Sequence, residues 1–97
     1  AETISQGSNV VRAATIITTN PQPIQDEILS RLGRGVTLIP ARGGFTREER
    51  TVLYCVITRA EVTRLKDLVH AKDPQAFMVI GRAYEALGEG FNPFKEE

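Results

Sequence analysis

The segment that most constrains the fold is an apolar run that leads directly into a helix-start signature. Between Thr51 and Thr58 the chain reads Val-Leu-Tyr-Cys-Val-Ile, a composition typical of a buried strand. Thr58 and Glu61 have the spacing of a capping box, in which the hydroxyl and the carboxylate each accept a hydrogen bond from a backbone N–H of the first helical turn. The segment therefore predicts a strand that passes at once into a helix.

The first half of the chain has the same succession of strand and helix patterns. Residues 10–19 are rich in Val, Ile and Thr and predict a strand. Residues 21–32 carry apolar side chains at helical spacing, and Gly33 is placed to cap the C-terminus of that helix. Residues 36–41 predict a second strand. It belongs at a sheet edge, because Pro40 has no N–H to donate to a neighbouring strand.

The second half completes the pattern. The predicted helix after Thr58 has an apolar stripe at Val62, Leu65 and Val69. Asp73-Pro74 ends this helix, because the residue before a proline disfavours the helical conformation. Residues 76–80 then predict a fourth strand.

The order of these elements predicts an α+β, ferredoxin-like fold (βαββαβ). Right-handed crossovers in both halves would give one four-stranded antiparallel sheet with two helices on one face. A chain of 97 residues is long enough for one core only. We expect a flexible lead-in over residues 1–9, a single domain over residues 10–94 and a frayed tail over residues 95–97. The glycine-containing, charged stretch 42–50 is predicted to be the loop between the second and third strands.

Composition argues against several classes of function. Twelve Lys and Arg balance 12 Asp and Glu, so no net charge attracts nucleic acid. The single cysteine, Cys55, excludes an internal disulfide and predicts a buried, inert thiol. The single histidine, His70, falls late on the second predicted helix, where we expect it to be exposed or near the helix C-terminus. We find no catalytic constellation, and we expect no enzyme activity, no cofactor and no metal.

Both faces of the predicted sheet are apolar. On the third strand one face would carry Leu53, Cys55 and Ile57, and the other would carry Val52, Tyr54 and Val56. Two helices cover one face only, and a large bare apolar face is rarely left in contact with water. We therefore expect a homo-oligomer, a trimer or a dimer, that packs through the open face. The alternative is that the tail from Tyr84 to Phe94 folds back over the sheet.

Two glycine–arginine segments are candidates for an anion site. Arg34 lies between two glycines, and Arg42 precedes Gly43 and Gly44. Consecutive glycine amides can form a nest for an anion, arginine adds a bidentate donor, and Phe45 could stack on a planar group. The alternative is that the glycines form a helix cap and a loop, and that both arginines are only solvated.

Several blocks of the sequence resemble the soluble C-terminal domain of YitT-type bacterial multi-pass membrane proteins. The blocks are Arg34-Gly-Val-Thr37, Arg42-Gly-Gly-Phe-Thr46, Ile57-Thr-Arg-Ala-Glu61, Asp73-Pro-Gln-Ala-Phe77 and Gly88-Glu-Gly-Phe91. This chain departs from the family pattern at Ala41, Phe45 and Arg47, where glycine, tyrosine and glycine are common. The resemblance implies a transmembrane portion before Ala1 and a domain on the cytoplasmic side of the membrane. It implies no reaction.

The plan of the domain is also similar to that of PII-like signalling proteins, ferredoxin-like trimers that bind nucleotides beside the loop between the second and third strands. With that similarity, we expect a non-enzymatic regulatory domain that self-associates and senses a small anionic ligand, such as a nucleotide, between subunits. The candidate ligand-binding residues are Arg34, Gly35, Thr37, Arg42, Gly43, Gly44, Phe45, Thr46, Gly88, Gly90 and Phe91. One alternative is a purely structural oligomerisation module without a ligand. Another is an enzyme that uses Arg42 as acylphosphatases use arginine.

Overall fold

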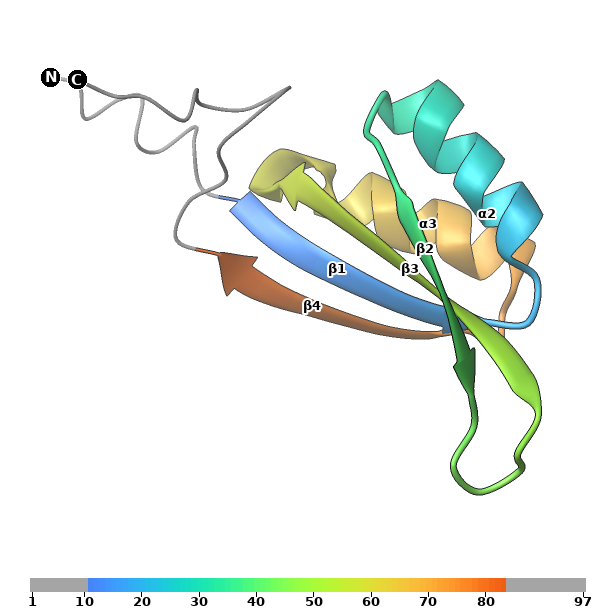
Figure 1. Ribbon diagram of the computed structural model, residues 1–97. Helices are drawn as coiled ribbons and strands as arrows, with labels where there is room; N and C mark the ends of the chain where they lie inside the picture. Colours follow the sequence, from blue (N-terminus) through green and yellow to red (C-terminus); the bar gives the residue numbers. More distant parts are fainter. Residues whose placement is uncertain (1–10, 84–97) are drawn as a thin grey trace, which may run out of the picture.

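The computed structural model describes residues 11–83 of the chain. The predicted lead-in, the predicted frayed end and the tail proposed to cover the sheet lie outside these residues. The elements follow the predicted order (Figure 1). They are β1 (Val11–Thr18), α2 (Pro21–Glu27) continued by a π-helical segment (Ile28–Leu32), β2 (Thr37–Arg42), β3 (Glu49–Thr58), a 3-10 turn (Arg59–Glu61), α3 (Val62–Lys72) and β4 (Phe77–Ala83).

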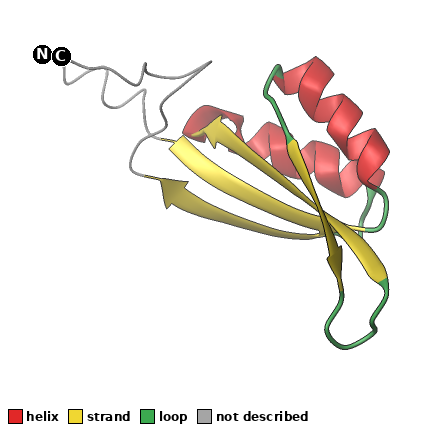
Figure 2. Cartoon of the chain, viewed as in Figure 1, coloured by secondary structure: helices red, strands yellow, loops and turns green. Residues whose placement is uncertain are grey.

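The strands form one antiparallel sheet in the order β2-β3-β1-β4. Both helices lie on the same face of this sheet (Figures 1 and 2). The α+β, ferredoxin-like prediction is therefore confirmed, with the first and third strands in the centre. Pro40 lies on the edge strand β2, where its missing N–H interrupts no pairing inside the sheet.

The strand ends differ from the prediction by one to three residues. β2 and β3 pair as far as Arg42 opposite Glu49, so the predicted loop 42–50 is shorter by a residue or two at each end. β4 continues to Ala83, opposite Val11 of β1. In both places antiparallel pairing with an existing strand outweighs the low strand propensity of charged residues and of Gly81.

The core lies between the sheet and the two helices. Its sheet side includes Leu53, Cys55 and Ile57, which the helices cover. The expected burial of Cys55 is confirmed, and this burial raises the pKa of its thiol to about 11. The fully or nearly buried core members are Ala14, Ile16, Ile24, Ile28, Leu32, Leu53, Cys55, Ile57, Leu65, Leu68 and Val69.

Side-chain hydrogen bonds fix the end of the sheet where β1 stops. Thr18 is 2% exposed, and its hydroxyl donates to the carboxylate of Asp73 while it accepts the Asn20 N–H at 2.9 Å. Asp73 also accepts the Gln75 N–H at 3.0 Å. These contacts join the turn after β1 to the turn after α3, so the chain leaves the sheet at a defined point.

Candidate functional site

The two glycine–arginine segments lie at opposite ends of β2. Arg34 and Gly35 precede the strand, and Arg42 is its last residue. The strand from Thr37 to Arg42 spans about 17 Å at a rise of roughly 3.3 Å per residue. Within one chain the structure therefore does not bring the two predicted groups together, and a small ligand that contacts both would need two chains.

Arg34 is part of the hydrogen-bond network at the start of α3. Its Nε donates to Glu61 Oε1 at 3.0 Å and to Oε2 at 3.3 Å, and Glu61 Oε1 also accepts the Thr58 N–H at 2.9 Å. The predicted capping box of Thr58 and Glu61 is complete. The side chains of Arg34 and Glu61 are only 20% and 16% exposed. Arg34 thus attaches the segment before β2 to the helix.

The pKa of Glu61 is consistent with a structural role for the carboxylate at the start of α3. Burial alone would raise its pKa, but hydrogen bonds from the Thr58 N–H and from Arg34, together with the charge of Arg34, lower the pKa below its ordinary value. The neighbouring Gly33 has φ 65°, the left-handed conformation of a helix cap. The predicted capping role of Gly33 is confirmed.

The loop after β2 is held by its own hydrogen bonds. The Gly43 N–H donates to the Glu48 carbonyl at 2.9 Å, and the Gly43 carbonyl accepts the Arg47 N–H at 2.9 Å. The Thr46 hydroxyl accepts the Glu48 N–H at 3.2 Å. The loop has its left-handed residue at Arg47, with φ 65°, and at neither Gly43 nor Gly44. The expected nest of consecutive glycine amides is therefore not formed in this conformation.

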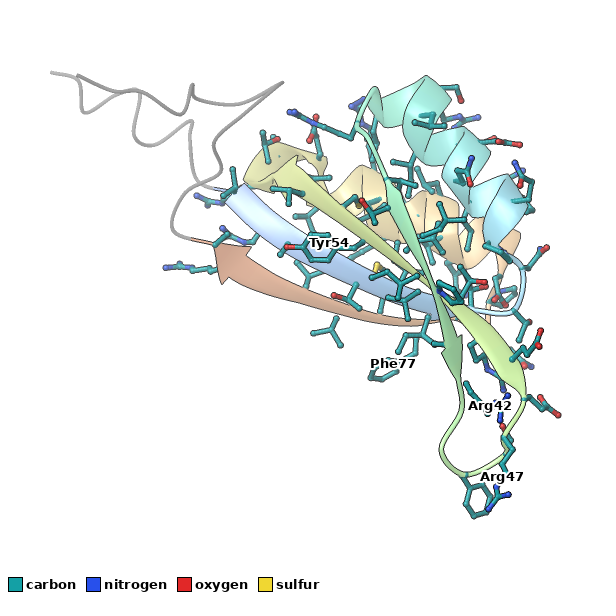
Figure 3. All side chains as sticks on the ribbon, in the orientation of Figure 1. Arg42, Arg47, Tyr54 and Phe77 are labelled. Atoms are coloured by element: carbon teal, nitrogen blue, oxygen red, sulfur yellow. The ribbon has the colours of Figure 1, made fainter. Side chains whose placement is uncertain are left out.

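The β2–β3 hairpin projects past the helices and carries exposed apolar and cationic side chains (Figure 3). Phe45 is 98% exposed. Arg42 and Arg47 are exposed as well. Within residues 11–83 neither arginine takes part in an ion pair. Of the predicted site residues, Arg42 to Thr46 are thus together and accessible, whereas Gly88, Gly90 and Phe91 lie outside the described residues.

A cleft of about 650 Å³ lies at the base of this hairpin. It forms because β1 pairs with β3 only as far as Thr18 opposite Thr51, whereas β2 and β3 continue together to Arg42 opposite Glu49. The residues that line the cleft are Thr19, Pro40, Ala41, Arg42, Glu49, Arg50 and Thr51. Of these only Arg42 was selected from the sequence. The other six gave no signal, because the cleft depends on where β1 ends relative to the hairpin.

The open face of the sheet is apolar, as expected. We define it by its exposed side chains Ile39, Tyr54, Phe77 and Val79, which are 45%, 42%, 61% and 51% exposed. Figure 3 shows Tyr54 and Phe77 on the side away from the helices. Half-buried neighbours on the same face are Ala13, Ile17, Val52 and Val56. The open face is therefore a largely apolar surface across four strands, with Thr15 and Thr37 beside Tyr54.

Three further features were candidates in the described chain: the single histidine, groups of possible metal ligands and membrane-spanning helices. His70 is exposed in the last turn of α3. Between residues 11 and 83 no three His, Cys, Asp or Glu side chains gather as metal ligands. No helix in that range has the length and apolar character needed to cross a bilayer.

Comparison with known proteins gives consistent matches. The family model described as "Uncharacterized protein conserved in bacteria (DUF2179)" matches residues 34–88. An uncharacterized protein in the cccA 5' region of Bacillus sp. (strain PS3) is 44% identical over 88 residues, which covers 91% of this chain and 59% of that protein. The crystal structure of a DUF2179 protein from Eubacterium ventriosum superposes with a TM-score of 0.62 at 30% identity, covering 73% of this chain and 97% of that one.

Membrane proteins are among the relatives. The UPF0750 membrane protein YpjC of Bacillus subtilis is 39% identical over 88 residues, covering 91% of this chain and 30% of YpjC. The UPF0750 membrane protein YitT of the same bacterium is 39% identical over 64 residues, covering 66% of this chain and 23% of YitT. The expected resemblance to YitT-type proteins is confirmed, and the chain spans 59% or less of the length of these curated relatives.

Proposed function

Since this chain belongs to the DUF2179 family of bacterial domains, we propose that it is a self-associating regulatory domain of a membrane protein. The relatives named as UPF0750 membrane proteins are about three times as long as the matched region, because it covers 30% of YpjC. The domain would hang from the membrane portion on the cytoplasmic side. It acts by binding and not by catalysis.

The apolar open face is the observation that carries this proposal. Four strands at a spacing of about 4.8 Å and roughly seven residues in length give a face of about 440 Å². Apolar patches of this size on a monomer are often functional. Two such faces would together bury about 900 Å², which is below the roughly 1,200 Å² of stable interfaces and in the range of weak, transient ones. Self-association through this face would therefore be weak enough to be regulated by a ligand.

The ligand in this proposal is a small anion, such as a nucleotide, that binds near the hairpin. Arg42 supplies a guanidinium group without an ion pair among the described residues, which can form a bidentate contact with a phosphate or carboxylate. Phe45, 98% exposed, can cover a planar group. Binding would change the loop and the contacts between subunits, and the membrane portion would respond to that change.

The second candidate is a purely structural oligomerisation module. It is favoured by the hairpin loop, in which the Gly43 N–H and the Glu48 N–H already have acceptors. A loop that is complete without a ligand is what such a module requires. The two candidates agree on the open face and differ only in whether an anion changes the association.

Light scattering on the purified domain tests self-association. We expect a dimer or trimer that Val79→Glu, on the open face, converts to monomer. The matched control is Leu29→Glu on the helical side, because Leu29 and Val79 are 47% and 51% exposed and neither change disturbs the core. A wild-type monomer at every concentration, or an equal effect of both variants, would overturn the proposal. A lower mass in solution for Val79→Glu, with the mass of Leu29→Glu unchanged, supports the proposal.

A further inference from the structure

We propose that the end of the sheet opposite the hairpin contacts an anionic membrane surface through Arg12, Arg59 and Arg82. We call this part of the molecule the cationic end and define it by these three residues. The inference rests on the proposed function, which attaches the domain to a membrane portion. It adds which end of the domain meets the lipid headgroups and which side chains bind them.

Strand pairing brings the three arginines to one end of the sheet. Arg12 of β1 lies directly opposite Arg82 of β4. On the other side of β1, Val11 lies opposite Thr58, the last residue of β3, and Arg59 follows immediately. Since neighbouring strands are about 4.8 Å apart, the three backbone positions fall within about 15 Å of one another. Figure 1 shows that β1 starts, and β3 and β4 finish, at the end of the sheet away from the hairpin loop.

The charge of the three arginines is not neutralised within the described part of the chain. Arg59 and Arg82 are exposed and Arg12 is half-buried. None of the three takes part in an ion pair among the described residues. Like charges directly opposite each other on neighbouring strands destabilise the pairing, so Arg12 and Arg82 would be stabilised by an anion beside them.

Charge is unevenly distributed along the sheet. The described part of the chain contains 11 of the 12 basic residues and 7 of the 12 acidic ones, because one lysine and five glutamates lie outside it. The acidic residue in the turn at the cationic end is Glu61, which is 16% exposed and pairs with Arg34. At the hairpin end, Glu48 and Glu49 lie among the arginines. The cationic end therefore has an excess of positive charge that the hairpin end lacks.

The path of the chain directs the cationic end toward the membrane portion. The described fold begins at Val11 and ends at Ala83, and these two residues lie opposite each other on β1 and β4. Whichever side of the domain continues into the membrane portion, the chain leaves from the cationic end. β3, with 10 residues, spans about 33 Å. This length is several times the screening length of about 8 Å at physiological salt, so the hairpin would lie beyond the field of the membrane.

This orientation is compatible with self-association through the open face. With the cationic end on the membrane, the strands run away from the surface and the open face stands at a steep angle to it. Two copies attached to the same bilayer can then meet through their open faces. The exposed side chains of Arg42 and Phe45 on the hairpin stay accessible from solution.

Lipid headgroup phosphates suit the three arginines. A guanidinium group donates two parallel hydrogen bonds to a phosphate. Each arginine close to an anionic surface raises the partition coefficient about fivefold, so three give roughly a hundredfold. The carboxylates of Glu85 and Glu89, which follow β4 in the sequence, reduce this factor. Attachment through the membrane portion raises the effective concentration of lipid and makes a modest affinity sufficient.

The test is cosedimentation of the full 97-residue chain with phosphatidylcholine vesicles that contain or lack phosphatidylglycerol. We expect the partition coefficient to be roughly tenfold or more higher with phosphatidylglycerol, and this preference to disappear as salt is raised. Arg59→Ala and Arg82→Ala should each lower binding to the anionic vesicles about fivefold. Arg47→Ala, an exposed hairpin arginine without an ion pair among the described residues, is the matched control and should leave binding unchanged.

Amide NMR with a paramagnetic lipid in the same vesicles reports which end meets the membrane. We expect broadening at residues 12, 59 and 82 and none at residues 43–47. Thermal unfolding shows whether each variant is folded, and an unfolded alanine variant is replaced by Arg59→Gln or Arg82→Gln. No preference for phosphatidylglycerol, an equal effect of Arg47→Ala, or equal broadening of the hairpin would overturn the proposal.

Two other partners of the arginines are outcomes of the same experiment. Duplex DNA that binds as tightly at the same salt, and loses binding in Arg59→Ala and Arg82→Ala, would overturn the membrane as the partner. A preference for phosphatidylglycerol that appears only when Glu85 and Glu89 are replaced by glutamine would assign the arginines to those carboxylates and overturn it as well.

Light scattering on the chain without vesicles separates this inference from self-association. A monomer that binds anionic vesicles through Arg59 and Arg82 would overturn self-association and support the cationic end. An oligomer that Val79→Glu dissociates, but that shows no preference for anionic vesicles, would overturn the membrane contact and leave self-association in place.

Discussion

The two arginine segments at the ends of β2 look alike in the sequence and have different surroundings in the structure. Arg34 is 20% exposed and donates to both carboxylate oxygens of Glu61. Arg42 is exposed on a projecting hairpin and takes part in no ion pair among the described residues. An arginine beside glycines is therefore not by itself evidence of a ligand site. What decides its role is whether a carboxylate accepts hydrogen bonds from the guanidinium, as Glu61 does from Arg34; Arg42 pairs with Glu49 across the strands without such a contact.

The comparison also assigns a different task to each end. At the Arg34 end, a charged network with little exposure to solvent fixes the start of α3, so that end should contribute to stability. At the hairpin end, the pair of Arg50 with Glu48 is more exposed, at 25% and 67%, and exposed pairs contribute little to stability. The hairpin end should therefore affect binding and have little effect on folding.

The largest effect should come from Glu61→Ala. This change removes the carboxylate of the capping box, which accepts hydrogen bonds from the Thr58 N–H and from Arg34 Nε. We expect the free energy of unfolding to fall by about 3 kcal/mol, from the loss of a cap and of charged hydrogen bonds. Urea denaturation measures it.

The matched change at the hairpin end is Glu48→Ala, which removes the acceptor of Arg50. Because that pair is largely exposed, we expect the loss to be within about 0.5 kcal/mol. Equal losses for the two glutamate variants would contradict the division of tasks between the ends.

The arginines themselves give the next largest difference. Arg34→Ala should cost about 2 kcal/mol, since Glu61 would keep its bond from Thr58 and lose its charged partner. Arg42→Ala should change the free energy of unfolding by less than about 0.5 kcal/mol, as for exposed positions generally. Thermal unfolding of both variants at equal concentration decides the matter, and a destabilised Arg42→Ala protein would show that the hairpin arginine has a structural partner.

Acid should reduce the contribution of the Arg34–Glu61 network to the free energy of unfolding. The pKa of Glu61 is lowered in the folded protein from an ordinary value of 4.5, so its contribution is fully present above that value and is lost as pH falls through the lower, folded pKa. Below pH 4.5 the stability of the wild type should therefore approach that of Glu61→Gln. Urea denaturation of both proteins from pH 7 to pH 3 checks this, and a gap that stays constant into acid would refute it.

Much of the fold follows from local sequence features. Pro40 has no N–H and lies on the edge strand, and the spacing of Thr58 and Glu61 gives the capping box. Strand ends were less predictable because they depend on the neighbouring strand. Glu49 and Gly81 have low strand propensity, yet each pairs with a residue of an adjacent strand.

The candidate site was only partly predictable because it is made by long-range contacts. Arg34 and Glu61 are 27 residues apart in the sequence. No local sequence pattern predicts an ion pair between residues so far apart. To predict the cleft, one would need to know that β1 stops at Thr18 while the β2–β3 hairpin continues. Arg42 and the exposed Phe45 could be selected from the sequence because a charged, glycine-containing loop is usually on the surface.

The glycines at the two ends should also differ. Gly33 has φ 65°, whereas Gly44 does not have a positive φ, and a Cβ would meet no atom within 4 Å at either position. Gly33→Ala should therefore cost about 1 kcal/mol from backbone strain alone, and Gly44→Ala should cost almost nothing. Chemical denaturation compares the two variants, and an equal cost would show that space and not backbone conformation decides the matter.

The smallest effect should be a gain in stability at the hairpin end. Arg47 is in the left-handed region with φ 65°, which costs a residue with a side chain about 1 kcal/mol, whereas glycine adopts it freely. Glycine also loses more conformational freedom on folding, so we expect Arg47→Gly to raise the free energy of unfolding by only about 0.5 kcal/mol. Arg47→Ala, which removes the charge and keeps the Cβ, is the control and should show no gain. A loss of stability in Arg47→Gly would mean that the arginine side chain holds the loop, and that the hairpin end is stabilised by side-chain contacts as the Arg34 end is.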